Sequence, residues 1–376
     1  MDLSLSEYQQ QLKNTAQDFM ERECSKDMLL DLEDTETGYS DEMWQKASEI
    51  GWLGMLVPEE YGGAGGTLTD AAVVFEQMGR GPLSGPFFSS GVLCALIVQE
   101  SGSDEQKRQY LPGIASGQDI VSLALTEPGY GWNAESVQMT VEEKNGGFAL
   151  NGTKLFVHDA ASSTRLICPV RTSNGGQPEQ GITLLMVDSH TAGVSTRLLS
   201  GFMGWVGEVT FDSVKVPASA VLGELGEGWD PLQRAFQKAM PVLCAYKVGG
   251  SQAVFDMSVE YSRTREQFGT PIGRFQRVQD HIIGIVNHLD AARWATYEAL
   301  WKLDTGRPAE TSVHLAKAVS SEGYYQACNG AHEVHAGLGV MREYGLTLHT
   351  KMSRTLYHLL GDPLFHRRLM VDTLDL

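Results

Sequence analysis

The sequence predicts a multidomain α+β protein in which a helical part, a β-rich part and a second helical part follow one another. Two observations lead to this prediction. Apolar residues recur at helical spacing toward both ends of the chain, and they alternate at every second position in its middle. A chain of 376 residues is also too long for one small core, so two or three domains are expected. We place the domains at 1–118, 119–226 and 227–376.

The N-terminal part is predicted to be helical. Apolar residues recur at helical spacing over residues 5–20, and Ser4 with Glu7 matches a capping box. A second helix is predicted for Asp41–Ile50. The glycine cluster at 62–66 matches neither a dinucleotide fingerprint nor a P-loop, because no strand precedes it and no Gly-Lys-Ser/Thr follows it. A flexible turn is the expected structure there.

Alternating apolar residues predict strands in the central part. The alternation is clear at 121–125 and at 137–141, and Asn145-Gly146-Gly147 is typical of a hairpin turn. Further strand-like runs span Leu155–Val157, Ile182–Val187 and Val209–Phe211. We therefore expect an antiparallel sheet or barrel inserted between the helical parts.

The helical period returns at about Trp229 and continues almost to the end of the chain. Breaks that contain glycine or proline, near 269–273, 305–308 and 337–339, divide this part into roughly four long helices. Long helices joined by short connections are typical of a four-helix bundle.

The composition argues against several classes of protein. A formal charge of −18 argues against nucleic acid as the main partner, because neutralising phosphates needs a basic face. No apolar run is long enough to span a membrane, and the polar N-terminus does not resemble a signal peptide, so a cytoplasmic protein is expected. Five scattered cysteines predict free thiols, and His332 and His335 lack the neighbouring ligands of a metal site.

Three segments have residue types suited to binding a ligand. The turn Leu125–Gly131 exposes backbone N–H groups that can hold an anionic or carbonyl-rich ring edge, although Pro-Gly turns are common. Farther along, Arg265 can give a bidentate fork to a phosphate, and Phe268 and Phe275 offer flat surfaces to an aromatic ring. A helix-capping arginine beside two core phenylalanines is an equally good interpretation. The small residues of His335–Gly339 allow a ligand to approach the backbone, or form an interhelical turn.

The order and spacing of these segments resemble the acyl-CoA dehydrogenase family over essentially the whole chain. The matching pieces are Gly51–Gly63 (GWLGMLVPEEYGG), Leu125–Gly129 (LTEPG), Leu150–Lys154 (LNGTK), Val209–Pro217 (VTFDSVKVP), Arg265–Gln276 and His335–Gly339 (HAGLG). The resemblance implies a helical N-terminal domain, a central antiparallel β-barrel and a C-terminal four-helix bundle, assembled as a dimer of dimers.

The resemblance also implies FAD as the cofactor, bound between the barrel and the bundle. The residues expected near the flavin ring are Leu123, Leu125, Thr126, Gly131, Trp132, Phe156 and His158. A second group is expected to hold the pyrophosphate, adenine and ribose side of FAD: Arg265, Phe268, Ile272, Phe275, Gln276, Glu333 and Gly337. The first five of these residues would come from the neighbouring subunit. The implied substrate is an acyl-CoA thioester, and the implied electron acceptor is an electron-transfer flavoprotein.

The chain departs from the family pattern at the catalytic base. Family members remove the α-proton of an acyl-CoA with a glutamate, while the β-hydrogen leaves as a hydride to the flavin. Counting without gaps, the usual base position is Leu360, and the position used in another branch is Met240. Neither side chain accepts a proton, so no catalytic residue is assigned there. In addition, Trp132 and Asp362 each replace a small hydroxyl residue, and His158 replaces a threonine.

Three hypotheses follow from this departure. The chain can be one subunit of a heteromeric tetramer whose homologous partner carries the base, as in the steroid side-chain branch that Phe156–Ala160, Leu360–Asp362 and His366-Arg367 resemble. It can be a self-sufficient homotetrameric dehydrogenase with Asp362 as the candidate base, unless Asp362 caps a helix or pairs with Arg367 or Arg368. It can also be a related flavin monooxygenase. A flavin-free structural subunit is the non-enzymatic alternative.

Overall fold

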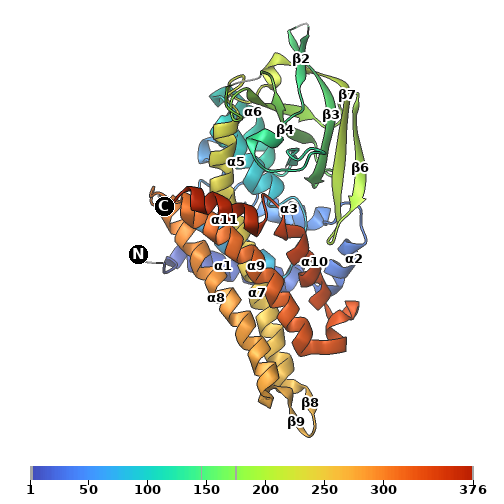
Figure 1. The fold of residues 1–376 in the computed structure, drawn as a ribbon, viewed down its shortest axis with the longest axis vertical. Helices are drawn as coiled ribbons and strands as arrows, with labels where there is room; N and C mark the ends of the chain where they lie inside the picture. Colours follow the sequence, from blue (N-terminus) through green and yellow to red (C-terminus); the bar gives the residue numbers. More distant parts are fainter. Residues whose placement is uncertain (1–2, 145, 174–175, 375–376) are drawn as a thin grey trace. The chain divides into compact units, whose positions relative to one another are not determined.

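The computed structural model describes residues 3–144, 146–173 and 176–374, and the chain divides into two compact units (Figure 1). The first unit comprises Met1–Asp34, Thr67–Leu83 and Met240–Leu376, and the second comprises Thr35–Gly66 and Ser84–Ala239. The β-rich part of the chain therefore lies in the second unit. No helix among the described residues is long and apolar enough to cross a bilayer.

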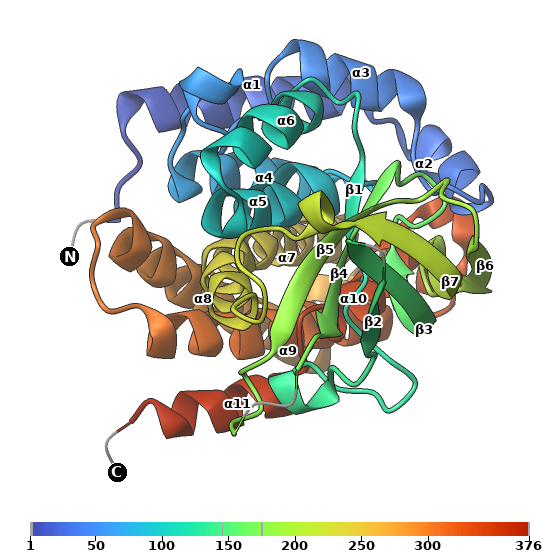
Figure 2. The same ribbon diagram turned by 90° about the horizontal axis from the view of Figure 1, so that it is seen from above.

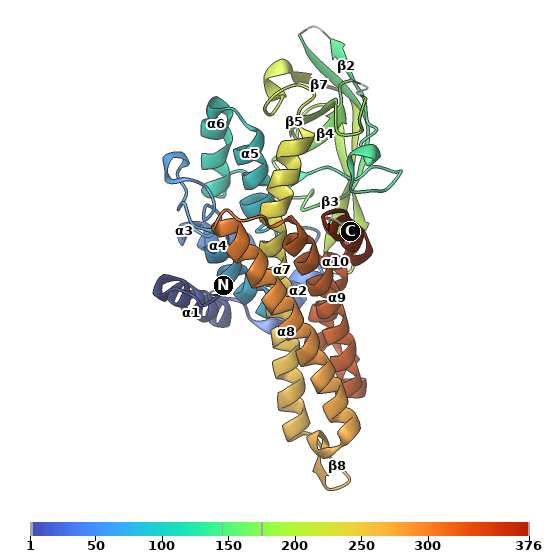
Figure 3. The same ribbon diagram turned by 60° about the vertical axis from the view of Figure 1, so that its left-hand side comes forward.

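The first unit is helical. Its helices are α1 (Glu7–Glu23), α2 (Lys26–Glu33), α4 (Leu68–Arg80), most of α7 (Trp229–Thr264), α8 (Gln276–Asp304), α9 (Glu310–His335), α10 (Leu346–Tyr357) and α11 (Pro363–Asp372). Helices α8 and α9 lie side by side, and α9 also contacts α10 and α11 (Figure 3). A hairpin of β8 (Glu266–Gln267) and β9 (Thr270–Pro271) joins α7 to α8.

The C-terminal part contains five helices within the described residues, α7 to α11, whereas the sequence predicts roughly four. The three predicted breaks are confirmed, since a hairpin, a loop and a short 3-10 helix, η6 (Ala336–Val340), lie at those places. The boundary missed by the prediction is Gly361, which separates α10 from α11 with a φ of +104°. A left-handed glycine ends a helix, but one glycine in a periodic run is a weak signal. The predicted helix count is therefore wrong.

The N-cap of helix α1 lies two residues after the predicted N-cap, Ser4. Ser6 is the N-cap, because its Oγ accepts from the Gln9 N–H at 3.1 Å and the Gln9 side chain accepts from the Ser6 N–H at 3.0 Å. Glu7, which the prediction placed at the third helical position, is the first helical residue. The predicted Ser4–Glu7 box is therefore wrong, although the helix itself is confirmed.

The second unit combines helices with two β-sheets. Its main helices are α3 (Asp41–Glu49), α5 (Ala95–Ser101) and α6 (Asp104–Ala115). One sheet has the order β1 (Val121–Leu123), β4 (Arg165–Arg171) and β5 (Ile182–Asp188). The other has the order β2 (Val141–Lys144), β3 (Gly147–His158), β7 (Trp205–Pro217) and β6 (Val194–Ser200), with all neighbours antiparallel (Figure 2).

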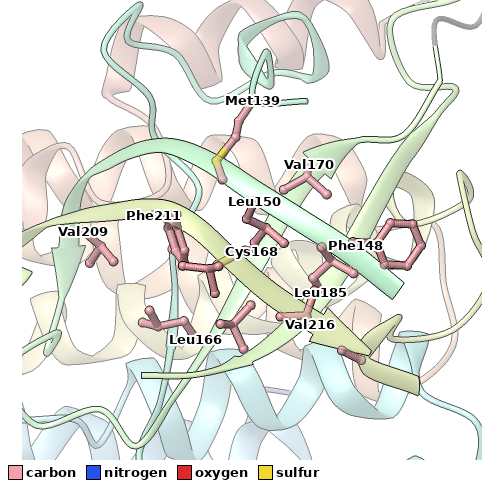
Figure 4. Packing of buried hydrophobic residues seen from close by; sticks show 14 of the residues in the cluster. Met139, Phe148, Leu150, Leu166, Cys168, Val170, Leu185, Val209, Phe211 and Val216 are labelled. Carbon is pink, nitrogen blue, oxygen red and sulfur yellow. The ribbon is translucent and has the colours of Figure 1, made fainter. Parts of the chain in front are cut away.

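One hydrophobic core joins the two sheets. Leu150 and Phe211 enter it from the four-stranded sheet, and Leu166, Cys168 and Leu185 enter it from the three-stranded sheet (Figure 4). All five side chains are buried. Since apolar side chains alternate along each strand, one face of each sheet turns toward this core.

The predicted antiparallel barrel is only partly right. The described residues form two separate sheets with no closed barrel, and β1 pairs with β4 in parallel. The alternation at 137–141 does not mark one strand, because β2 begins only at Val141. Of the predicted hairpin turn, Asn145 lies outside the described residues, while Lys144 pairs with Gly147 as a hairpin requires. Alternation identifies the buried face of a strand but not its partner.

The glycine cluster at 62–66 is a turn, as predicted, but hydrogen bonds hold it in place. Four consecutive backbone N–H groups, from Gly63 to Gly66, donate to carbonyl groups of residues 54–58. A Cβ at Gly63 would lie 2.0 Å from the Val57 carbonyl oxygen, so only glycine fits. The expectation of a flexible turn is therefore wrong.

Candidate functional site

The segment after β1 lies beside the end of β3. The Ala124 N–H donates to the Ile167 carbonyl at 2.9 Å, and the Leu155 N–H donates to the Thr126 carbonyl at 2.7 Å. These bonds bring Thr126 next to the stretch that holds Phe156 and His158. Two of the predicted flavin-facing segments, 123–131 and 156–158, are thus neighbours within the second unit.

A buried ion pair supports this arrangement. Lys154 Nζ lies 2.7 Å from Glu127 Oε1 and donates to the Pro169 carbonyl, also at 2.7 Å. Glu127 Oε2 accepts from the backbone N–H groups of Gln138 and Met139, each at 3.0 Å. Burial lowers the pKa of Lys154, and the charge of Glu127 opposes that shift. The pair therefore joins the turn at Glu127 to β3 and β4.

Glu127 and Lys154 belong to the motifs LTEPG and LNGTK, but neither residue has a predicted role. The available signal was a lysine in the alternating strand 147–158, at a position that faces the core. A buried lysine requires a partner, and the nearest acidic residue in another motif was Glu127.

An aromatic cluster lies at the same place. The ring of Tyr130 is 5.0 Å from that of Trp132 and 6.2 Å from that of Phe156, centroid to centroid. Tyr130 and Phe156 are both half-exposed, and each has a φ of +54°. A left-handed backbone at a non-glycine residue costs about 1–2 kcal/mol and often marks a functional site. At Gly131 a Cβ would lie 1.8 Å from Ser136 Oγ, so the turn requires glycine there.

His158 and Asp159 follow at the end of β3. Burial lowers the pKa of His158, although the charge of Asp159 opposes this shift. Burial raises the pKa of Asp159, whose carboxylate accepts a hydrogen bond of 2.5 Å from Ser89 Oγ. His158 therefore presents a neutral ring, which can both donate and accept a hydrogen bond.

The hairpin after α7 presents an arginine and an aromatic ring to solvent. Arg265 is exposed, and its carbonyl accepts from the Ile272 N–H at 2.8 Å. Phe268, at the tip with a φ of +55°, is 94% exposed, and its ring stands at 89° to that of Phe275, 6.1 Å away. The interpretation of Phe268 as a core residue is therefore wrong. Ile272 is buried, and Gln276 is the exposed first residue of α8.

The end of α9 contains the other two predicted cofactor-binding residues of the first unit. Glu333 is exposed and lines a groove of about 280 Å³ between α8 and α9, together with His281 and His288. Gly337 lies in η6, and no atom lies within 4 Å of the position that a Cβ would take. The backbone at Gly337 is therefore open to a ligand.

The two usual base positions are apolar and buried. Met240 on α7 is 3% exposed, and Leu360, just after α10, is 8% exposed with a φ of +59°. Asp362 is the N-cap of α11, where its carboxylate accepts from the Phe365 N–H at 2.8 Å. This contact agrees with the capping interpretation of Asp362.

Two buried histidines support the turn at Leu360. His366 Nε2 lies 2.7 Å from the Leu360 carbonyl, which only accepts, so Nε2 carries the hydrogen. His366 Nδ1 is then the acceptor for the Nδ1–H of His314, 3.0 Å away. Burial lowers the pKa of His314 to about 4 and that of His366 to about 2. Both rings are therefore neutral at neutral pH.

Acid is expected to destabilise the first unit because its buried histidines resist protonation. Burial lowers the pKa of His349 and of His314 to about 4, from a usual value of 6.5. At pH 5 the unfolded chain binds protons that the folded chain excludes, so stability falls from pH 6.5 toward 4, by on the order of 2 kcal/mol per histidine. Urea unfolding at pH 7 and pH 5 measures this loss. His349→Gln should reduce it, and equal midpoints at the two pH values would contradict it.

Comparison with known proteins identifies the family. Models of the acyl-CoA dehydrogenase family match its N-terminal domain to residues 6–118, its middle domain to 122–214 and its C-terminal domain to 226–374. The 3-(aryl)acrylate reductase of Clostridium sporogenes is 31% identical over 90% of this chain and 91% of its own length. The chain belongs to the acyl-CoA dehydrogenase family. It is therefore an oxidoreductase of the class that acts on CH–CH bonds.

Other members of the acyl-CoA dehydrogenase family show similar coverage. The probable acyl-CoA dehydrogenase YngJ of Bacillus subtilis is 30% identical over 92% of both chains. The structure of PigA with FAD and proline superposes with a TM-score of 0.92 at 27% identity, over 99% of this chain and 98% of that one. The ChsE4–ChsE5 complex of Mycobacterium tuberculosis gives a TM-score of 0.89 at 24% identity, over 99% and 98%, which shows the shared fold.

The residues of this acyl-CoA dehydrogenase family member fit FAD. An exposed guanidinium at Arg265 suits a pyrophosphate, and the flat exposed ring of Phe268 suits an aromatic base. The open backbone at Gly337 suits a ribose or phosphate group. In the second unit the cluster of Trp132 and Phe156 offers apolar surface to a flat ring. These features and the family membership support FAD as the cofactor.

Proposed function

We propose that the chain is a flavin-bearing subunit of an acyl-CoA dehydrogenase and that a homologous partner supplies the carboxylate that removes the α-proton. The observation that carries this proposal is the apolar character of both base positions, Met240 and Leu360, which are buried in the bundle. FAD, when bound, accepts the β-hydrogen of the acyl thioester as a hydride. This chain binds and orients the cofactor and the thioester, whereas the α-proton goes to the carboxylate of the partner.

The proposed roles of the cofactor-binding residues follow from their chemistry. Arg265 would pair with the pyrophosphate of the neighbouring subunit's FAD, and Phe268 would offer its ring to the adenine. Phe275 and Gln276, at the start of α8, would hold the same side of the cofactor. In the other unit, the backbone around Thr126 meets the polar edge of the flavin ring. The proposed acceptor for the electrons is an electron-transfer flavoprotein, as the family resemblance implies.

Replacing Arg265 with methionine is expected to raise the dissociation constant for FAD about 10- to 100-fold. A hydrogen bond to a charged group contributes about 1.5–3 kcal/mol, and methionine keeps the length of the side chain without the charge. Titration of the flavin-free protein with FAD measures the change. Arg263→Met, in the last turn of α7, is the matched control and should leave the affinity unchanged. An unaltered FAD affinity in Arg265→Met would contradict the assignment.

The partner in this proposal is a homologous chain that keeps a glutamate at one of the two base positions. Asp362 is less suited to be this chain's own base, because its carboxylate already caps α11. The flavin monooxygenase hypothesis is less well supported, because the hairpin retains the arginine and aromatic residues that suit FAD of the dehydrogenase type.

Co-expression with such a homologue tests the proposal. The two chains are expected to co-purify as one heteromer that binds FAD and oxidises an acyl-CoA, with a rate that depends on the partner's glutamate. Replacing the partner's glutamate with glutamine should abolish turnover, while the two chains should remain associated. The proposal fails if no homologue associates with the chain and the chain oxidises an acyl-CoA alone.

A further inference from the structure

Two lysines are buried together in the helical unit. Lys247 on α7 and Lys317 on α9 are at most 1% exposed. Lys247 Nζ donates to Ser321 Oγ at 2.7 Å, and Lys317 Nζ lies 3.3 Å from the same oxygen. Within the described residues neither amine has an aspartate or glutamate oxygen within ion-pair distance. A buried lysine pair without a carboxylate is costly if both amines are charged.

The geometry of the pair favours a single shared proton. Both amines lie within hydrogen-bond distance of one hydroxyl, that of Ser321, so two ammonium groups would place two positive charges around a single neutral group. Burial lowers the pKa of Lys247 to about 8. Burial and the charge of Lys247 together lower the pKa of Lys317 well below its usual value. Lys317 is therefore the amine of the pair that loses its proton more readily.

Lys317 contacts the turn at the usual base position. Lys317 Nζ donates to the Gly361 carbonyl at 2.6 Å, while His366 holds the preceding carbonyl, that of Leu360, at 2.7 Å. Leu360 and Gly361 both have positive φ values, +59° and +104°. Such a turn persists only when its surroundings hold it. Lys247 lies seven residues after Met240 on α7, so the pair is on the same side of that helix as the second base position.

We propose that Lys247 and Lys317 are positioning residues of the acyl-thioester site, which share one proton and fix the Leu360–Gly361 turn through the Gly361 carbonyl. The part of this inference that concerns the thioester rests on the proposed function, because a base at that turn must reach the α-carbon. The part that concerns the turn is independent of the proposed function. A second proton, taken up in acid, would place two ammonium groups around one hydroxyl and weaken their hold on the turn.

Other ionisable groups act on the pair from the helices packed around it. Cys244 on α7 and Asp362 before α11 raise the pKa of Lys317, although they do not outweigh burial. His314 on α9 and His366 on α11 contact each other beside the turn, and burial together with the neighbouring lysines lowers the pKa of His366. The pair is therefore surrounded by groups of both kinds, and no carboxylate forms an ion pair with either amine within the described residues.

Lysine-selective NMR of the FAD-loaded protein tests the charge state without turnover. Signals assigned by their loss in Lys247→Met and Lys317→Met are followed from pH 5 to pH 11. We expect the Lys247 signal to titrate near pH 8 and the Lys317 signal to titrate well below its usual value of 10.5. Two lysines that both titrate near their usual value of 10.5 would overturn the inference. Lys26→Met, at an exposed residue at the start of α2, should leave the signals of Lys247 and Lys317 unchanged.

Hydrogen exchange tests the positioning role. Lys317→Met is expected to raise the exchange of the amides at 360–366 at least tenfold at pH 7, after correction for intrinsic rates. Lys247→Met should keep these amides protected at pH 7 and extend their protection to lower pH, because Lys317 then has no charged neighbour. Unchanged protection in Lys317→Met would overturn the positioning role. Neither experiment depends on catalysis, so failure of the proposed function would leave both results interpretable.

Discussion

Replacing Lys154 with methionine is expected to lower the free energy of unfolding of the second unit by about 3–5 kcal/mol. The change removes one partner of a buried ion pair and leaves the Glu127 carboxylate inside the protein without its cation. The Pro169 carbonyl also loses a donor at 2.7 Å. Since the pair joins the turn at Glu127 to β3 and β4, FAD retention should fall together with stability. Urea unfolding, followed by tryptophan fluorescence, measures the loss.

Two further variants separate the ion pair from simple loss of packing. Lys154→Met combined with Glu127→Gln should be more stable than Lys154→Met alone, because glutamine still accepts from the Gln138 and Met139 N–H groups but has no charge to bury. Arg197→Met breaks an exposed pair with Glu208 on the same sheet and should change the free energy of unfolding little, because solvent screens the pair. A Lys154→Met variant as stable as Arg197→Met would show that the buried pair has no structural role.

Placing a glutamate at residue 360 is expected to give the chain an acid–base group of its own. In the FAD-loaded protein, Leu360→Glu should accelerate reduction of the flavin by an acyl-CoA about 10²–10⁴-fold, the usual contribution of a general base. Residue 360 is buried, and burial raises a carboxyl pKa toward the range useful for proton abstraction. Stopped-flow measurement of flavin absorbance gives the rate.

The control is Leu360→Gln, which has the shape of glutamate but accepts no proton. If Leu360→Glu and Leu360→Gln reduce their flavin equally slowly, residue 360 is not placed to act as a base, and the alignment of that position is wrong. Met240→Glu is the corresponding test at the second position. Since Leu360 already has a left-handed backbone, glutamate requires no new backbone conformation there.

The helices and the overall order of the chain could be predicted from local patterns. Helix α3 matches its prediction because Ser40 caps it and Trp44 and Ala47 repeat on its buried face. The pairing of β1 with β4 could not be predicted, because residues 121 and 165 are far apart and alternation does not specify a partner. The boundary between α10 and α11 at Gly361 could not be predicted either, because it depends on the hydrogen bonds that Lys317 and His366 make to the turn.

The sequence indicates residues for the candidate site but not the contacts that they make. The motif that holds Arg265 indicates a phosphate-binding hairpin, yet only the structure shows that Phe268 is exposed at its tip. The sequence gives one indication that Lys247 is buried, because this lysine lies in the apolar run from Pro241 to Gly250. That signal does not identify its partner, since Lys317 is on another helix and the two meet only in the folded bundle.

Anaerobic mixing of the FAD-loaded chain, alone, with a series of acyl-CoA thioesters tests the central claim most directly. The claim is that this chain binds the cofactor and the thioester but has no group that takes the α-proton. The expected result is thioester binding, seen as a change in the flavin spectrum, with no reduction of the flavin within the time of a catalytic cycle. Rapid and complete reduction by any acyl-CoA in the series would contradict the claim.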